Sequence, residues 1–321
     1  MNKELRIVFM GTPEFAVASL DALYKASFHI VGVITTADKK AGRGKKLQES
    51  AVKKYAIKKQ IPVLTPLNLK DPQFLDVLKK WNANLQVVVA FRMLPAIVWQ
   101  APKYGTFNLH ASLLPQYRGA APINHAIING EKESGVSTFF LDQEIDTGRI
   151  IEQKKCSISE TDSAGDLHDK LMEMGAGLVV ETVKAIANNT VKTQNQEELL
   201  GDKNIKLAPK IFKADGQIQW NHSAKDIYNK IRGLSPYPSA WTMIKNSHKN
   251  TEMSLKIFAS SITKNENGLP GHIKTDGKSY LSIQTSDYLL EIKELQLQGK
   301  KRMKTIDFLR GFPISKDWIC V

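Results

Sequence analysis

The chain has 321 residues, enough for about two domains and for a hydrophobic core that needs neither disulfides nor metals. Hydrophobic residues make up 42% and charged residues 24%, which excludes a wholly disordered or fibrous protein. Lys and Arg number 45 against 32 Asp and Glu, a net charge of +13, so the partner classes narrow to nucleic acid, an anionic membrane surface and an anionic small molecule.

The first half of the chain alternates short apolar runs with helical patterns. Three runs, at residues 5–10, 30–34 and 85–91, predict buried parallel strands. Between the first two, residues 15–26 place apolar side chains at helical spacing, with Thr12 as the expected N-cap and Pro13 in the first turn. Strands that alternate with helices predict a doubly wound, Rossmann-like α/β fold with a mostly parallel sheet.

The turn after the first strand argues against a nicotinamide cofactor. Gly11 stands alone where a dinucleotide site has three glycines in the pattern Gly-x-Gly-x-x-Gly. Pro13 also removes one of the N–H groups that would bind a pyrophosphate. A nicotinamide oxidoreductase is therefore a weak alternative, which a lack of NAD(P)H binding would exclude.

A long helix is predicted over residues 163–187, with Asp162 or Ser163 as its cap. The polar segment that follows indicates a linker. We therefore expect a catalytic domain, a linker and a basic domain at residues 1–189, 190–207 and 208–321.

The last of these domains carries short apolar runs separated by Gly, Asn, Pro and Asp. The runs lie at residues 254–258, 280–284 and 288–295, after a helical pattern at residues 224–234. We expect a small, OB-like β-barrel preceded by a helix.

Cys156 and Cys320 are the two cysteines, so neither a disulfide framework nor a CxxC metal site is available, and no metal is predicted. The first residues resemble neither a signal peptide nor a transit peptide. Because no stretch approaches the ~18 apolar residues of a membrane helix, we expect no membrane partner. A cytoplasmic monomer is the expected form.

Residues 106–148 carry the most informative chemistry. Alternation along a strand places Asn108 and His110 on one face, and an acidic loop further on could bring Asp146 against His110. Such a trio suits acyl or formyl transfer to an amine, because Asn108 and His110 can stabilise a developing oxyanion while a carboxylate paired with imidazole relays protons. Taken singly, each has a structural alternative: a buried histidine, a turn-capping aspartate or an asparagine bonded to the main chain.

The run FNLHASLLPQYRGAAPINHAI, with DTGRII downstream, resembles the formyltetrahydrofolate-dependent formyltransferases. Collinear matches extend over nearly the whole chain, from RIVFMGTPEFAVASLDAL to GKKRMKTIDFLRG. The resemblance implies that 10-formyltetrahydrofolate is the formyl donor and that Asn108, His110 and Asp146 are catalytic. The implied folate-binding residues are Ser112, Leu113, Leu114, Pro115, Phe91 and Met93. The chain departs from the family's Ala-Tyr-Gly pattern at Ala90-Phe91-Arg92, where family members bind folate largely through main-chain groups.

The positive charge is concentrated in two parts of the chain. Residues 208–321 hold 18 basic against 10 acidic residues, and residues 39–59 hold nine basic residues against Glu49 alone. Such a run is usually a solvated loop, but two basic regions beside one catalytic pocket fit a large polyanion better. The resemblance implies methionyl-initiator tRNA as the formyl acceptor. The residues expected to contact it are Arg43, Lys45, Lys46, Lys210, Lys300, Lys301 and Arg302.

Two further alternatives remain at this point. A formyltransferase acting on a small amine, such as a sugar nucleotide or glycinamide ribonucleotide, shares the catalytic trio but needs no basic β-domain. The other alternative is a noncatalytic RNA-binding protein with the fold of an enzyme, which would bind RNA without releasing a formyl group. The intact trio argues against this alternative.

Overall fold

The computed structural model describes residues 4–41, 46–202, 204–246, 251–263, 268–315 and 317–321. Arg43 and Lys45 lie outside these residues, and Lys46 is described by its main chain alone. The chain divides into two compact units. The first comprises residues 1–119, 133–157 and 168–207, and the second residues 120–132, 158–167 and 208–321.

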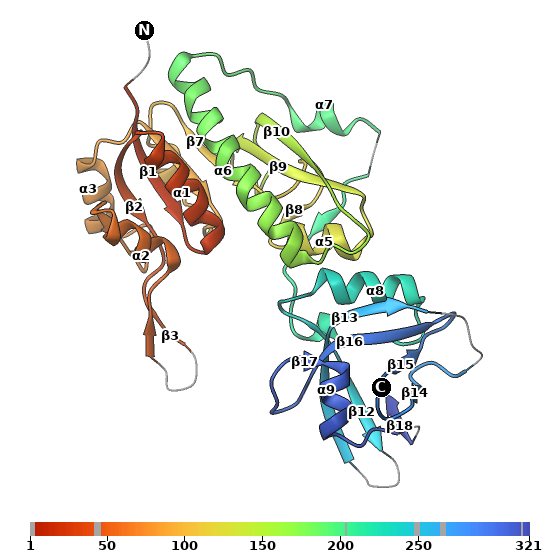
Figure 1. Ribbon diagram of the computed structural model, residues 1–321. Coiled ribbons are helices and arrows are strands. Elements are labelled where there is room, and N and C mark those ends of the chain that lie inside the picture. The colour runs from red at the N-terminus through yellow and green to blue at the C-terminus, as the bar shows by residue number, and fades with distance from the viewer. Residues whose placement is uncertain (1–3, 42–45, 203, 247–250, 264–267, 316) are drawn as a thin grey trace. The chain divides into compact units, whose positions relative to one another are not determined.

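A seven-stranded sheet with the order β10-β9-β7-β6-β1-β2-β5 forms the centre of the first unit (Figure 1). Five strands run parallel: β1 (Arg6–Gly11), β2 (His29–Ile34), β5 (Val63–Leu64), β6 (Leu85–Val89) and β7 (Thr106–His110). The antiparallel pair β9 (Glu133–Phe140) and β10 (Ile150–Ser157) completes it. The prediction of a mostly parallel sheet is therefore confirmed.

Helices and short strands lie between these strands and, in the chain, after the last of them. The helices are α1 (Glu14–Lys25), α2 (Ala51–Lys58), α3 (Pro72–Lys80), α4 (Ala96–Trp99), α6 (Ala164–Asn188) and α7 (Gln196–Leu200). The short strands are β3 (Lys39–Ala41), β4 (Lys46–Gln48), β8 (Arg118–Gly119) and β11 (Leu207–Ala208). On one face of the sheet, Val8, Met10 and Val88 pack against Phe74 and Leu78 of α3 because their strands present apolar side chains on both faces.

Of the helix caps predicted from the sequence, the one for α1 was wrong and one for α6 was confirmed. The expectation that Thr12 caps α1 was wrong: Pro13 occupies the cap position and no side chain caps the helix. The reason is that the amides of Ala16 and Val17 both donate to the Pro13 carbonyl, so the first turn begins one residue later. For α6, the Ser163 hydroxyl accepts from the Asp166 amide, which confirms the second of the two predicted caps.

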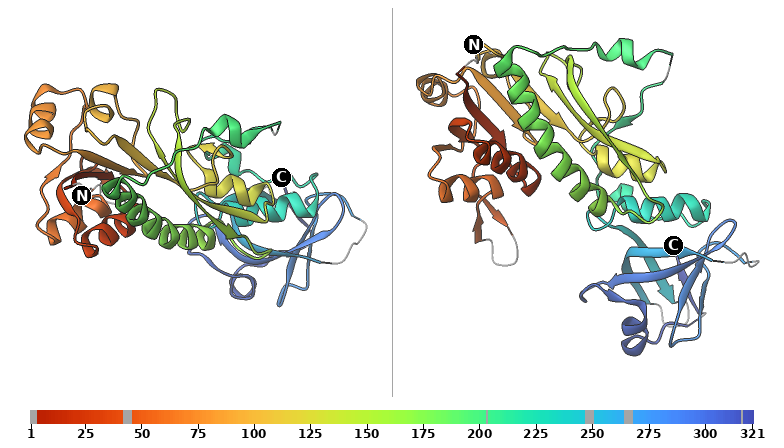
Figure 2. Two further views of the ribbon diagram at one scale, coloured as in Figure 1. Left: turned by 90° about the horizontal axis from the view of Figure 1, so that it is seen from above. Right: turned by 45° about the horizontal axis from the view of Figure 1, so that its top comes forward.

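The second unit contains a barrel-like antiparallel sheet, seen from two sides in Figure 2. Its strands are β12 (Ala240–Asn246), β13 (Thr251–Ile262), β14 (Ile273–Thr275), β15 (Leu281–Gln284), β16 (Leu289–Leu297), β17 (Met303–Lys304) and β18 (Trp318–Cys320). The sheet order is β14-β15-β16-β13-β12-β18, with β17 on β16. The predicted apolar runs fall in β13, β15 and β16, so the expected barrel is confirmed.

One close main-chain approach joins the two ends of this sheet. The Cys320 amide donates to the Gly271 carbonyl at 2.9 Å, and His272 bridges Ile319. Gly271 has a φ of +86°, and a Cβ there would lie 2.3 Å from the Cys320 carbonyl oxygen, so the closure requires glycine. The barrel is thus nearly closed.

Helices complete the second unit. They are α5 (Pro122–Ile128), α8 (Ala224–Gly233), α9 (Thr305–Gly311) and the short 3₁₀ turn η1 (Ala214–Gly216). Ile227 and Ile231 of α8 are buried in the barrel core, as the predicted helix at 224–234 requires. The Asn124 amide of α5 donates to the Gly233 carbonyl of α8 at 2.7 Å. Residues 120–132 therefore cluster with the second unit, although the boundaries expected at residues 189 and 207 stay a prediction.

Candidate active site

Asn108 and His110 lie on β7, the parallel strand next to the antiparallel pair. His110 is the last residue of β7, whereas Asn108 pairs with Phe139 of β9 two residues earlier. In open α/β sheets, ligands bind at the carboxyl ends of the parallel strands. The strand therefore delivers both side chains to the edge where a substrate is expected.

The two ring nitrogens of His110 have different surroundings. Nε2 lies 2.8 Å from the Tyr117 carbonyl oxygen, which can only accept, so Nε2 donates and carries a proton. Nδ1 faces the Asp146 carboxylate, with Oδ2 at 3.7 Å. His110 is only 7% exposed, so both contacts are largely shielded from water. The predicted approach of Asp146 to His110 is confirmed.

Asp146 reaches this position from the loop between β9 and β10. Its φ of +58° lies in the left-handed region, which aspartate tolerates better than most residues. Its Oδ2 accepts from the Gly119 amide at 3.0 Å. The loop turns back at Gly148, where a Cβ would lie 1.8 Å from the Phe140 carbonyl oxygen, so no other residue fits.

Two residues that the sequence prediction did not assign support this loop. The Gln196 amide donates to the main-chain carbonyls of Asp146 and Gly148, and its oxygen accepts from Arg118. Arg118 lies in a run that marked the family, yet nothing there indicates its partner. Gln196 lies in the polar segment expected to be a linker, and no motif or periodicity marks it.

Comparison with known proteins adds the family. Residues 5–183 match the family described as formyl transferase, and residues 210–313 match its C-terminal domain. The chain belongs to the formyl transferase family. It is accordingly a formyltransferase with a two-part family architecture.

Named relatives and solved structures agree with this assignment. Proteins named methionyl-tRNA formyltransferase from Bacteroides fragilis and Bacteroides thetaiotaomicron are each 52% identical to it, over 98% of both chains. Among solved structures, the sugar 3N-formyltransferase WlaRD is 23% identical with a TM-score of 0.63, covering 93% of this chain and all of the other. HypX from Aquifex aeolicus, solved with tetrahydrofolic acid, is 15% identical with a TM-score of 0.64, covering 96% and 47%. These two structures support the fold.

The Ser112–Pro115 run of the formyltransferase follows β7 in the chain and is mostly buried. The Ser112 hydroxyl donates to the Gln116 carbonyl, and Leu114 belongs to a small apolar cluster with Phe139. Of these four side chains only that of Leu113 is partly exposed. The folate contacts predicted for this run therefore rest on Leu113 and on main-chain atoms.

The segment after β6 presents different side chains. Met93 is 72% exposed, whereas Phe91 is half-buried against the apolar cluster beneath it. Arg92 is exposed, and its guanidinium donates to the carbonyls of Pro66 and Leu67. Phe91 and Met93 thus remain the candidates for a ligand contact in this segment.

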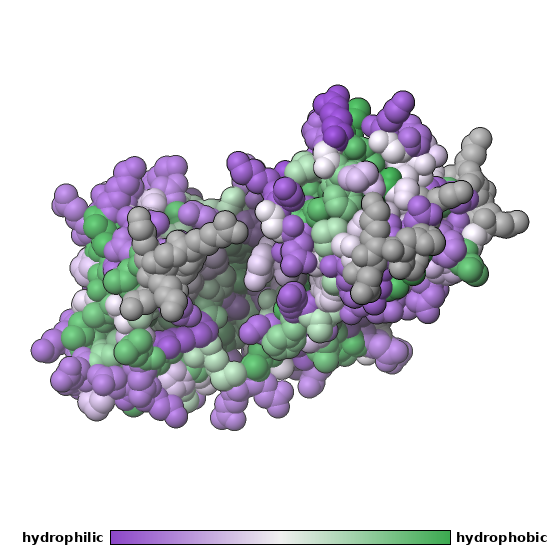
Figure 3. Space-filling view, turned by 90° about the horizontal axis from the view of Figure 1, so that it is seen from below, coloured by the Kyte–Doolittle hydropathy of each residue, from purple (hydrophilic) through white to green (hydrophobic). Residues whose placement is uncertain are grey.

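The basic residues expected to contact tRNA differ in how far their charge is paired. Lys210, Lys300 and Lys301 are exposed. Arg302 instead binds Glu294 with two of its nitrogens and lies over the Phe258 ring, 4.4 Å from its centroid. On the face shown in Figure 3, hydrophilic side chains are spread widely, with hydrophobic residues between them.

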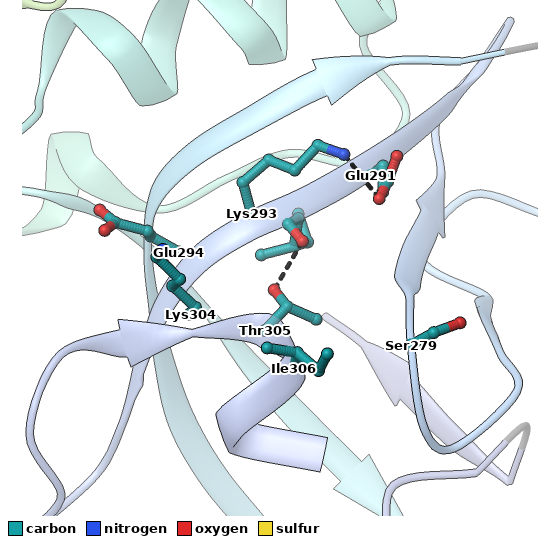
Figure 4. A pocket seen from close by; sticks show the side chains of 8 residues that line it. Ser279, Glu291, Lys293, Glu294, Lys304, Thr305 and Ile306 are labelled. Carbon is teal, nitrogen blue, oxygen red and sulfur yellow. Dashed lines mark hydrogen bonds and ion pairs between the residues drawn. The ribbon is translucent and has the colours of Figure 1, made fainter. Parts of the chain in front are cut away.

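A cavity of about 320 Å³ lies in the barrel unit, near the start of α9 (Figure 4). It is lined by Ser279, Glu291, Ile292, Lys293, Glu294, Lys304, Thr305 and Ile306. Its acidic groups are neutralised, because Glu291 pairs with Lys293 and Glu294 pairs with Arg302. The cavity contains none of the trio.

Two further features, a membrane-spanning helix and a metal cluster, are absent from the described residues. No helix among them is both long and apolar enough to span a bilayer. Nor does that part of the chain gather three or more His, Cys, Asp or Glu side chains around a point where a metal ion would bind.

Proposed function

We propose that the protein transfers the formyl group of 10-formyltetrahydrofolate to the amino group of methionyl-initiator tRNA. The observation that carries this proposal is the convergence of His110 and Asp146 at the end of β7, beside Asn108. The identity of about one residue in two to relatives named methionyl-tRNA formyltransferase supports the choice of acceptor.

In the proposed reaction the methionyl nitrogen forms a bond to the formyl carbon, and the bond from that carbon to the folate nitrogen breaks. The Asn108 amide donates a hydrogen bond to the formyl oxygen as negative charge develops there. His110 contributes through Nδ1, because Nε2 already donates to the Tyr117 carbonyl. A protonated Nδ1 can therefore serve the same oxygen.

Asp146 has two roles in this scheme. Its carboxylate lies 3.7 Å from Nδ1 of His110, which keeps the imidazole facing the reaction, and it accepts a proton from the attacking amine. That proton is finally returned to the folate nitrogen that leaves, so the exchange is balanced without any outside acid. No serine or cysteine nucleophile is needed, because transfer is direct.

Phe91, Met93 and Leu113 would contact the formyl donor. Folates carry flat aromatic rings, which pack well on apolar side chains such as exposed Met93. Ser112, Leu114 and Pro115 would act indirectly by fixing the main chain, since their side chains are buried. These residues therefore suit an apolar, partly aromatic ligand that is oriented by main-chain groups.

The acceptor is the feature that separates this proposal from a small-amine formyltransferase. Exposed Lys210, Lys300 and Lys301 would neutralise phosphates of a long polyanion, with Arg43, Lys45 and Lys46 as further contacts. Arg302 would contribute less because it is paired with Glu294. A sugar nucleotide would engage few of these positions.

A direct assay tests the proposal. The purified protein is incubated with 10-formyltetrahydrofolate and, in parallel, with methionyl-initiator tRNA, uncharged initiator tRNA, free methionine or an amino-sugar nucleotide. We expect formylation of methionyl-initiator tRNA at least about a hundredfold more efficiently than of the other acceptors, given typical specificity limits. Preferential formylation of the sugar nucleotide, or no formylation at all, would overturn it.

We further infer that the enzyme acts in the cytoplasm as a monomer. Cys156 and Cys320 are both free thiols, which suits a reducing compartment. Light scattering of the purified chain alone and with tRNA tests the monomer, and a stable dimer without tRNA would contradict it.

A further inference from the structure

Gln196 is a buried polar residue that the proposed reaction does not use. It is the first residue of α7 and is only 1% exposed. A buried primary amide is costly unless its two N–H donors and its carbonyl oxygen all find partners. Gln196 meets this condition fully, and every partner belongs to the neighbourhood of Asp146.

The four hydrogen bonds of Gln196 connect two segments of the site. Nε2 donates to the main-chain oxygens of Asp146 at 2.9 Å and Gly148 at 2.8 Å. Oε1 accepts from Nε of Arg118 at 3.0 Å and from its Nη2 at 2.7 Å. The next residue, Gly119, donates its amide to the Asp146 carboxylate. One amide thus fixes both the main chain of Asp146 and the segment that orients its carboxylate.

The segment that carries Gln196 is itself held in place. Gln194 and Ile150 exchange two main-chain hydrogen bonds, of 2.8 and 2.9 Å, which extend the edge of β10. The Arg149 guanidinium donates to the Thr193 hydroxyl at 2.8 Å. The amide is therefore presented from a fixed main chain, as a positioning group must be.

We propose that Gln196 is a positioning residue for formyl transfer. It holds Asp146 in its left-handed conformation with the carboxylate directed at His110. Without its N–H donors, the buried Gly148 carbonyl and the partly buried Asp146 carbonyl lose their partners, and the main chain of Asp146, with φ at +58°, is free to relax. This inference rests on the proposed function, because it assumes that Asp146 acts in catalysis.

Gln196→Glu tests the inference with almost no change in shape. The variant still accepts from Arg118 but presents an oxygen, instead of N–H donors, to the carbonyls of Asp146 and Gly148. We expect kcat to fall about ten- to a hundredfold, the cost of a small misplacement, with both KM values within about twofold. Gln194→Glu is the matched control, because it makes the same change on an exposed side chain of the same segment.

A second readout needs no substrate. With ¹⁵N-labelled histidine, the ring-nitrogen resonances of His110, assigned with a His110→Asn variant, should move in Gln196→Glu and stay unchanged in Gln194→Glu. A merely structural role for Gln196 would not move them in a variant whose thermal unfolding is normal. If the wild-type protein fails to formylate methionyl-initiator tRNA, the proposed function falls, while a moved His110 resonance still supports the positioning role.

Either of two results overturns the inference: a folded Gln196→Glu protein with kcat within about twofold of wild type, or unchanged His110 resonances. If Gln196→Glu does not fold, Gln196→Asn replaces it. That variant keeps an amide but is one methylene too short to reach both carbonyls, so the same loss of kcat is expected, and a wild-type kcat overturns the inference equally.

Discussion

Nδ1 of His110 lies 3.7 Å from Oδ2 of Asp146, too far for a direct hydrogen bond but close enough for the carboxylate charge to act on the imidazole. We expect Asp146→Asn to reduce kcat by about a hundred- to a thousandfold, because the amide cannot accept the proton that the attacking amine loses. The Asn oxygen can still accept from Gly119, so folding should be preserved. Asp142→Asn, an exposed change in the same loop, is the control for steady-state kinetics, and equal activity of both variants would contradict the assignment.

Asn108→Ala and His110→Ala test the rest of the trio. Each should lower kcat by orders of magnitude with little change in the Kd for tRNA, because both residues are assigned to the chemical step and neither is among the basic residues predicted to bind phosphates. Single-turnover formylation with bound tRNA measures the chemical step. Near-normal rates in both variants would remove the trio from the mechanism.

Two glycines should respond oppositely to alanine. Gly148→Ala places a Cβ 1.8 Å from the Phe140 carbonyl oxygen, so the loop must move and both stability and kcat should fall. Gly177, within α6, has nothing within 4 Å of the added Cβ. Gly177→Ala should therefore raise the free energy of unfolding by about 0.5–1 kcal/mol with unchanged kcat. Thermal unfolding and kinetics of both variants decide the matter, and a destabilised Gly177→Ala would contradict the packing around α6.

The basic residues of the barrel unit should differ in how much each contributes to the salt dependence of tRNA binding. Lys300→Ala combined with Lys301→Ala should weaken tRNA binding and lower the slope of log Kd against log salt by about 1.5–2. Arg302→Ala should change the slope less, because its charge is paired with Glu294 and its guanidinium packs on Phe258. Binding titrations at several salt concentrations measure this. An equal slope change for Arg302 alone would show that its ion pair opens on binding.

Asp287 should make the barrel unit sensitive to acid. Burial raises the pKa of its carboxyl, but hydrogen bonds from Ala224, Thr285 and Tyr288 outweigh this and hold the pKa below its usual value. The ionised carboxylate therefore stabilises the fold above about pH 4–5, and this contribution is lost as pH falls through the lowered pKa.

Asp287→Asn tests that sign. At pH 7 the free energy of unfolding of the variant should be lower than that of wild type by about 1 kcal/mol. In acid the two free energies should converge. Asp202→Asn, an exposed change, controls for net charge. A difference that persists below about pH 3 would show that the hydrogen bonds, and not the charge, provide the stability.

The sequence predicted the elements better than the contacts between them. Residues 85–89 and 106–110 became strands because apolar periodicity is local, and Ser163 capped α6 because a capping box involves residues three apart. Thr12 failed as a cap because the main-chain path at Pro13 decided the first turn.

The hydrogen bonds that hold Asp146 in place could not be predicted from local sequence patterns. Gln196 and Arg118 are 78 positions apart, and Gly119 reaches Asp146 through its main-chain amide, which any residue type carries. No residue pattern along the chain encodes either contact. Asp146 itself was predicted from its acidic loop and from the family resemblance, and the strand before that loop pairs with β7.

The hydrogen bonds of Gln196 also bear on the order in which the enzyme gains activity. A chain synthesised as far as residue 190 already contains Asn108, His110 and Asp146, but lacks the amide that lies 50 positions beyond Asp146. Contacts of such long sequence separation form late, because the loop between them must close first. A growing chain can therefore complete its central sheet before its catalytic loop is fixed, so folding and competence for formyl transfer are separate events in time.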